Sequence, residues 1–337
     1  MSAHIVSVGI IGVGHVGPHV ANSLILQGIA DELLLCDVNE TKLAAEVQDL
    51  NDSVAFAPHR VTVVNCHADY ERLAGCDVIV NAAGNVSLAA VSRTGELFAT
   101  VDTARTFVGR LAGAGFKGFW VNISNPCDVV TRELHRLSGL SAGHVIGTGT
   151  LLDSARLRTV LSLSTKLAPE SIQAYMIGEH GDTQIAALHA ASIAGKPLRE
   201  LAGNPRYDLD FKEIEVAARR GGYIAYRGKQ CTEYAVANAG ARLIRAIIHD
   251  ENVALPACVW LDGQYGQQGL YTSVPCVIGA DGVREIIELP LSTEEQQGFN
   301  ASCDTVRRNF RRLAPFSIAD SRRNPVVLPP LPEESEA

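Results

Sequence analysis

The chain has 337 residues, of which 47% are hydrophobic and 20% charged, so it can bury a large core and is not intrinsically disordered. Its formal net charge of −8 disfavours a nucleic acid or an anionic membrane as the main partner. No apolar run reaches the roughly 18 residues that a membrane span requires, and because the N-terminus lacks a basic leader we expect no signal peptide.

A glycine-rich loop lies between the first predicted strand and the first predicted helix. Residues 5–11 are an apolar run that predicts a buried strand, and residues 12–17 read Gly-Val-Gly-His-Val-Gly. Apolar residues then repeat at helical spacing up to Gly28, and a second predicted strand at 33–36 ends at Asp37, twenty residues after the loop. A glycine loop alone is a weak signal, but strand, loop, helix and acid in this order form a dinucleotide fingerprint.

This fingerprint predicts how a dinucleotide is held. Glycines let backbone N–H groups approach a pyrophosphate at the N-terminus of the helix. A carboxylate at position 37 accepts hydrogen bonds from an adenosine ribose diol and repels a 2′-phosphate, so we predict NAD rather than NADP as the cofactor. The residues of this region that we expect to bind it are Gly12, Gly14, His15, Val16, Gly17 and Asp37.

Strands and helices continue to alternate up to residue 147. Further strands are predicted at 60–65, 76–83, 119–123 and 145–147, and helices at 43–54, 98–108 and 129–137. Six strands with helical crossovers predict a doubly wound parallel sheet, a Rossmann domain over residues 1–147. Ligands bind such sheets at the carboxyl ends of the strands, which adds Ala83-Gly84 and Ser124-Asn125-Pro126 to the candidate site. From the dipeptide alone, Asn125-Pro126 fits either an amide held in the cleft or a plain turn.

The alternation ends after residue 147, which predicts a second, α+β substrate domain over residues 148–324. Helices are expected at 216–226, 233–249 and 292–313, and strands at 257–261, 270–278 and 283–289. Residues 280–282 read Ala-Asp-Gly, a hairpin signal between the last two strands. Residues 325–337 are rich in Pro and Glu, and we predict a disordered tail there.

An acid, an arginine and a histidine fall within residues 151–182. Asp153 and Arg156 are three residues apart and therefore share a face if the segment is helical. His180 follows an apolar run and stands between Glu179 and Gly181, as a side chain at a bend after a strand does. Taken alone, this pattern fits a surface ion pair with a structural histidine, or a site that holds a small carboxylate and moves a proton.

The cysteines and histidines do not indicate a metal site. The eight cysteines contain no Cys-x-x-Cys pair, so we expect neither a structural zinc ion nor a disulfide framework. We expect the protein to be located in a reducing cytoplasm. A metal hydrolase is disfavoured because His180 has no second histidine at i+4 spacing.

In this order, the motifs resemble those of the L-2-hydroxy-acid dehydrogenases, the lactate/malate dehydrogenase family, from residue 5 to about residue 315. They are the glycine loop, Ser124-Asn125-Pro126, residues 147–156 (Gly-Thr-Gly-Thr-Leu-Leu-Asp-Ser-Ala-Arg) and residues 178–182 (Gly-Glu-His-Gly-Asp). Within the family, Gly84-Asn85, the long loop after them and Gly228-Lys229 before Thr232 are most similar to L-2-hydroxyisocaproate dehydrogenases.

The resemblance implies an NAD-dependent oxidoreductase of a small 2-oxo or 2-hydroxy acid, assembled as a homodimer or homotetramer. It implies that His180 is the acid/base and Asp153 its partner, while Arg156 holds the substrate carboxylate. It places Asn125 near the carbonyl and the nicotinamide, and Thr232 in the wall of the pocket.

The loop at residues 85–97 departs from the family pattern. The family ends this loop with an arginine that polarises the substrate carbonyl, but the expected position holds Leu97, and Arg93 is the only arginine in the loop. Arg93 either substitutes for it or is a solvated charge. The loss of one such hydrogen-bond donor lowers the rate about 10²–10³-fold, which weakens a dehydrogenase but does not abolish its activity. We therefore expect an enzyme. The alternative is an NAD-binding protein with weak or no catalysis.

The same loop indicates the substrate. Malate dehydrogenases use an additional loop arginine for a second carboxylate, whereas residues 85–91 here carry no charge. We therefore expect a 2-oxo acid with an apolar side chain of medium or branched form, and L-lactate dehydrogenase as the alternative.

Overall fold

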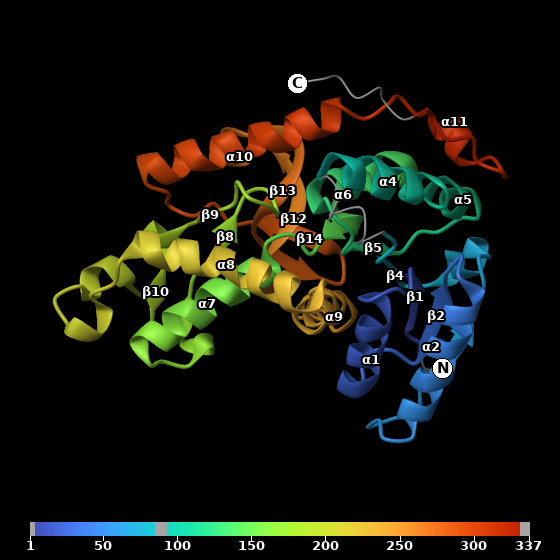
Figure 1. The fold of residues 1–337 in the computed structure, drawn as a ribbon, viewed down its shortest axis with the longest axis horizontal. Coiled ribbons are helices and arrows are strands. Elements are labelled where there is room, and N and C mark those ends of the chain that lie inside the picture. Colours follow the sequence, from blue (N-terminus) through green and yellow to red (C-terminus); the bar gives the residue numbers. More distant parts are fainter. Residues whose placement is uncertain (1–3, 85–92, 331–337) are drawn as a thin grey trace.

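The computed structural model describes residues 4–84 and 93–330, and its centre is one nine-stranded sheet (Figure 1). Six strands of this sheet are parallel and run in the order β6-β5-β4-β1-β2-β3, which confirms the predicted Rossmann architecture. Their bounds are β1 (Ser7–Ile11), β2 (Glu32–Cys36), β3 (Thr62–Asn65), β4 (Val78–Asn81), β5 (Phe119–Asn122) and β6 (Val145–Gly147).

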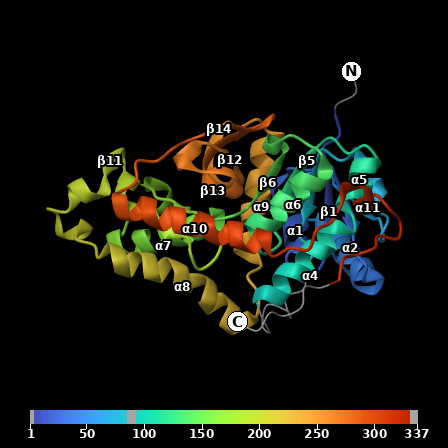
Figure 2. The same ribbon diagram turned by 90° about the horizontal axis from the view of Figure 1, so that it is seen from above.

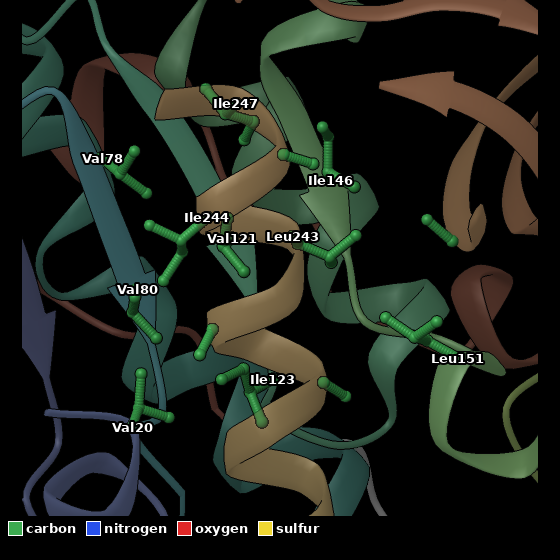
Figure 3. Close-up of a cluster of buried hydrophobic side chains, with 14 of the residues drawn as sticks. Val20, Val78, Val80, Val121, Ile123, Ile146, Leu151, Leu243, Ile244 and Ile247 are labelled. Atoms are coloured by element: carbon green, nitrogen blue, oxygen red, sulfur yellow. The ribbon is translucent and has the colours of Figure 1, made fainter. Parts of the chain in front are cut away.

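Helices cover both faces of the parallel strands, so the strands are buried on both sides and appear in the sequence as continuous apolar runs. One face packs against α1 (Gly17–Gln27), α2 (Glu40–Val54) and α9 (Tyr234–Ile248), and the other against α4 (Arg93–Arg105), α5 (Val108–Gly113) and α6 (Cys127–Ser138). Figure 3 shows α9 on its face, where Leu243, Ile244 and Ile247 lie among side chains of β4, β5 and β6.

Local chemistry explains where the first helices begin and end. Pro18 occupies the first turn of α1, and Gly28 ends the helix at φ 66°, a left-handed conformation that glycine adopts at low cost. The single helix predicted at 98–108 is wrong, because α4 and α5 are separate helices. They meet at Phe107, which is 1% exposed and stacks on Trp120 with the ring centroids 6.1 Å apart.

The sheet continues beyond the predicted Rossmann region. The antiparallel strands β12 (Val253–Asp262), β13 (Gln268–Gly279) and β14 (Gly282–Ile286) extend it, with Cys258 of β12 paired to Gly147 of β6. The predicted hairpin is confirmed, because Gly279 pairs with Gly282 across the two-residue turn. The division into domains at residue 148 remains a prediction, but this boundary does not interrupt the sheet.

The remaining elements after β6 form a layer beside the parallel strands (Figures 1 and 2). A third apolar cluster lies between α7 (Leu151–Thr165) and α8 (Phe211–Lys229), while α10 (Thr293–Arg311) begins with a capping box of Ser292 and Glu295. The short strands here are β7 (Ile172–Gln173), β8 (Met176–Ile177), β9 (Ile185–Ala186), β10 (Ser192–Ile193) and β11 (Lys196–Pro197), of which only β8 was expected from the sequence.

The end of the described chain packs on the Rossmann region. A short helix, α11 (Ile318–Ser321), lies against α5, and residues 325–330 contain no helix or strand. The predicted tail beyond residue 330 lies outside the described residues.

Within residues 4–84 and 93–330, no helix is long and apolar enough to cross a membrane. Short 3₁₀ helices are Tyr70–Gly75, Ala142–His144, Pro169–Ser171, Leu188–Ala190, Leu198–Leu201, Pro205–Tyr207 and Gln264–Gly266.

Candidate active site

Three side chains from two segments meet at the N-terminal end of α7. Asp153 is 4% exposed, and its carboxylate bridges the other two. Its Oδ2 accepts a hydrogen bond from His180 Nδ1 at 2.6 Å, and its Oδ1 accepts one from Arg156 Nη1 at 2.8 Å. The side chains of His180 and Arg156 retain 24% and 19% exposure, so both reach solvent beside a buried carboxylate. The structure therefore brings the predicted trio together, and it is not a surface ion pair.

The charges of this cluster support one another. Burial favours the neutral form of Asp153, but His180 and Arg156 outweigh it and hold the pKa of the carboxyl below its ordinary value. Burial likewise favours neutral His180, but the Asp153 carboxylate more than offsets this and raises the pKa of the imidazole to about 9. At neutral pH the imidazole is therefore protonated and can donate a proton.

His180 projects from a bend that only glycine can begin. β8 ends at Ile177, and Gly178 follows at φ 95°, with its N–H and C=O bonded to the backbone of Ser273 at 2.9 and 3.1 Å. A Cβ on Gly178 would lie 2.6 Å from Ser302 Oγ, so a side chain there is excluded by space as well as by φ. The predicted strand end and bend before His180 are confirmed.

The glycine loop has the three features expected of a dinucleotide cradle. Gly12 has φ 94°, and a Cβ there would lie 2.6 Å from the backbone of Ala83. A Cβ on Gly17 would lie 1.9 Å from the Gly12 carbonyl oxygen, so α1 starts as close to β1 as a glycine permits. On Gly14 a Cβ would meet nothing within 4 Å, which leaves that backbone open to a ligand.

Asp37 lies beside this loop at the end of β2. Its Oδ2 accepts a hydrogen bond from Val13 N at 2.7 Å and its Oδ1 one from Asn39 N at 2.8 Å. The Asp37 carboxylate is thus fixed next to the loop, where its remaining lone pairs can accept hydrogen bonds from the hydroxyl groups of a ribose. The residues present therefore fit NAD.

The carboxyl ends of β4 and β5 are joined by buried polar side chains. Asn81 Nδ2 donates to Asn122 Oδ1 at 2.8 Å, and Ser124 Oγ donates to the Ala83 carbonyl at 2.7 Å. Asn125 is exposed and follows directly, joined to Pro126 by a cis peptide bond at the start of α6. The structure therefore places Ala83 and Asn125 at adjacent strand ends, as predicted for a cleft.

Two family models cover most of the chain. Residues 6–147 match the NAD binding domain of lactate/malate dehydrogenases, and residues 150–316 match the alpha/beta C-terminal domain of the same enzymes. The chain belongs to the lactate/malate dehydrogenase family. As a member of this family it is an NAD-dependent oxidoreductase that acts on 2-hydroxy acids.

Named relatives agree with this assignment. The chain is 40% identical over 306 residues to an L-lactate dehydrogenase of Fusobacterium nucleatum, a match that covers 89% of this chain and 95% of that protein. It is 38% identical over 302 residues to an L-lactate dehydrogenase of a Geobacillus strain, covering 89% and 94%. Among solved structures, the ligand-bound minor L-lactate dehydrogenase of Enterococcus mundtii superimposes with a TM-score of 0.86 at 32% identity, covering 91% of this chain and 98% of that one. These relatives support the family, but not the closer resemblance to L-2-hydroxyisocaproate dehydrogenases.

In this lactate/malate dehydrogenase, Leu97 does not stand where a substrate-polarising arginine could act. Leu97 is 2% exposed on α4 and belongs to the apolar cluster between that helix and the sheet. A side chain at position 97 therefore faces the core, so the leucine there does not by itself indicate weak catalysis. Arg93 is the first residue of α4; residues 85–92, including Asn85, and the side chain of Arg93 lie outside what the structure describes.

Thr232 lies in the corner between α8 and α9, and this corner is tied to the glycine loop. The next residue, Glu233, accepts a hydrogen bond from the ring of His15 at 3.0 Å and pairs with Lys229 at 2.5 Å. Within the described residues, no hydrogen bond joins Thr232 to His180 or Arg156. The structure thus connects the residue next to Thr232 to the glycine loop.

Sequence reasoning missed several residues of the site. Gly221 and Gly222 of α8 lie against Arg156, since a Cβ on either would be 3.3 or 3.2 Å from its side chain. Two adjacent glycines inside a predicted helix were the available signal, because they lower helix stability without an evident local reason. Within residues 4–84 and 93–330, no group of three or more His, Cys, Asp or Glu side chains could hold a metal ion.

Replacing Leu97 by Arg tests the position directly. We expect the free energy of unfolding to fall by about 3 kcal/mol or more, because an unpaired guanidinium would be buried in an apolar cluster. Urea unfolding measures the change, and Leu163→Arg on α7 is the control, since Leu163 is 66% exposed. A stable Leu97→Arg variant with a higher turnover rate would show instead that position 97 faces the substrate.

Proposed function

We propose that this enzyme is an L-2-hydroxy-acid dehydrogenase for monocarboxylic acids with an apolar side chain, interconverting the 2-oxo acid and the L-2-hydroxy acid. The observation that carries the proposal is the buried Asp153 carboxylate, which holds His180 at 2.6 Å and Arg156 at 2.8 Å. A fixed guanidinium beside a protonated imidazole can bind a carboxylate and protonate the carbonyl next to it.

The side chains divide this work. Arg156 uses one nitrogen for Asp153, and the rest of its planar guanidinium can meet the substrate carboxylate through parallel hydrogen bonds. His180 is oriented through Nδ1, so Nε2 donates a proton to the carbonyl oxygen in reduction and accepts the hydroxyl proton in oxidation. The glycine loop and Asp37 would hold NAD, which supplies or accepts the hydride when bound.

The polarising group that we propose is Arg93. It is the first residue of α4, and position 97 of the same helix faces the core. Carbonyl polarisation by a positioned cation stabilises the charge that develops on oxygen during reduction.

The substrate side chain is proposed from two observations. Residues 85–91 carry no charge for a second carboxylate, and Gly221 and Gly222 present only backbone beside Arg156. An apolar side chain larger than methyl fits this combination. Pyruvate and L-lactate are the second candidate pair, supported by relatives named L-lactate dehydrogenase.

We also propose a reducing cytoplasm and a homodimer or homotetramer. All eight cysteines are free and buried, which suits a compartment where thiols stay reduced. The oligomeric state rests on the family resemblance alone.

The pH dependence of catalysis reports on His180. Reduction of the 2-oxo acid needs the protonated imidazole. The kcat/KM for reduction should therefore be highest below a pH of about 9 and fall as the pH rises through that value. The variant Asp153→Asn lacks the carboxylate that does most to raise the His180 pKa, while burial still lowers this pKa. Reduction should therefore be lost at a lower pH than in the wild type, nearer to the ordinary histidine pKa of 6.5. The check is to measure kcat/KM against pH for reduction and for oxidation, in the wild type and in Asp153→Asn. The same midpoint pH in the wild type and the variant would contradict the prediction.

Substrate choice can be measured by NADH absorbance with pyruvate, 2-oxoisocaproate and oxaloacetate. We expect 2-oxoisocaproate to be reduced with a kcat/KM at least equal to that of pyruvate, and oxaloacetate to react poorly. Gly222→Ala should lower kcat/KM for 2-oxoisocaproate about tenfold more than for pyruvate. Gly228→Ala on the same helix is the control, because its added Cβ would meet nothing within 4 Å. No turnover with any of the three acids would refute the proposed function.

The variant Arg93→Gln tests the polarising group. We expect kcat to fall by about 10²–10³, while the dissociation constant for NADH stays the same, because only the developing charge loses its partner. Stopped-flow reduction and NADH fluorescence titration measure the two quantities. An unchanged kcat would identify Arg93 as a solvated loop charge.

A further inference from the structure

We propose that Asp128 and Ser302 are positioning residues that hold the His180 backbone from two sides. The proposal rests on the catalytic role given to His180 above. Both residues lie behind the bend at 178–184, on α6 and α10, and each accepts a hydrogen bond from one of two consecutive backbone N–H groups in that bend.

Asp128 holds the amide of His180 itself. It is the second residue of α6 and 1% exposed, and its Oδ2 accepts a hydrogen bond from His180 N at 2.9 Å. Its Oδ1 is buried and has no hydrogen-bond partner within the described part of the chain. Burial raises the pKa of the Asp128 carboxyl to about 8, so at neutral pH it is mainly protonated. When ionised it adds to the rise of the His180 pKa, though less than Asp153 does, and in either charge state it can hold the His180 backbone.

Ser302 holds the preceding amide. It is fully buried on α10, and its Oγ accepts a hydrogen bond from Glu179 N at 2.8 Å. The same Oγ lies 3.0 Å from the hydroxyl of Thr183, which also donates to the Glu179 carboxylate. The bend is thus closed on itself and attached to α10 through Ser302 and through Asn309, whose Nδ2 donates to the Glu179 carboxylate at 3.5 Å.

The bend needs these two attachments because it is not part of a sheet. β8 ends at Ile177 and β9 begins at Ile185, so regular strand pairing does not fix His180. A buried N–H group requires an acceptor, and Asp128 and Ser302 provide one each. Catalytic geometry is sensitive to such supports, because a displacement of about 1 Å can cost about 10²-fold in rate.

Neither residue is hydrogen-bonded to Arg156 or to the glycine loop within the described residues. A change at either position should therefore lower kcat and leave cofactor binding intact. Asp128→Ala and Ser302→Ala should reduce kcat by about 10- to 100-fold, with the NADH dissociation constant within about twofold. Asp128→Asn should retain most of the activity, because a neutral amide oxygen can accept the same bond from His180 N.

Ser321→Ala is the matched control. Ser321 is also fully buried, and its Oγ donates to the Ile318 carbonyl at 2.7 Å on α11, away from the bend. This variant loses a buried hydroxyl as Ser302→Ala does, so it should lose comparable stability in urea and keep its kcat. An equal loss of kcat in both serine variants would overturn the proposal.

The His180 pKa supplies a readout that does not depend on turnover. Misplacing the ring weakens its bond to Asp153, so NMR titration should give a lower His180 pKa in folded Asp128→Ala and Ser302→Ala than the wild-type value of about 9. Asp128→Asn loses only the carboxylate charge and should lower this pKa less than Asp128→Ala does, whereas Ser321→Ala should keep the wild-type value. An unchanged pKa in both loss variants would overturn the proposal. Inactivity of the wild-type chain on every 2-oxo acid would instead refute the proposed function and leave this titration interpretable.

Discussion

The candidate site depends on one carboxylate that is shared by two cations. Asp153 is buried, and the free energy of keeping an ionised carboxylate there is offset by direct hydrogen bonds from His180 and Arg156. The same arrangement fixes the tautomer of the imidazole and the plane of the guanidinium. In the proposed function, proton transfer by His180 and carboxylate binding by Arg156 are thus coupled through a single side chain.

The fold supplies the three parts of the site from separate elements. The glycine loop and Asp37 follow β1 and β2, Ala83 and Asn125 follow β4 and β5, and Asp153 lies in the first turn of the helix after β6. Parallel strands end at one edge of the sheet, so this order along the chain becomes proximity in space. His180 comes from outside that edge and relies on a bend held by neighbouring helices.

Much of this arrangement could be predicted from the sequence. Doubly covered parallel strands appear as continuous apolar runs, and two of the loop glycines, Gly12 and Gly17, stand where steric contact excludes a side chain. The pairing of Asp153 with Arg156 follows from helical spacing, but the contact with His180, 27 residues away, required the family resemblance. Strands of two residues, such as β9 and β10, carry no periodic pattern and were not predictable. Leu97 was misjudged because counting along a loop does not show where α4 begins or which side faces the core.

The pairing of Cys258 with Gly147 joins the two regions that match the family models in a single sheet, and α9 from the later region packs on the strands of the earlier one. The two halves are therefore not independent folding units. If the chain were cut after residue 147, the later piece would expose both an unpaired strand edge and the apolar face of a helix, a combination that promotes aggregation. The distance between the hydride carrier and the acid/base is consequently set by one continuous scaffold, and not by the docking of two separate bodies.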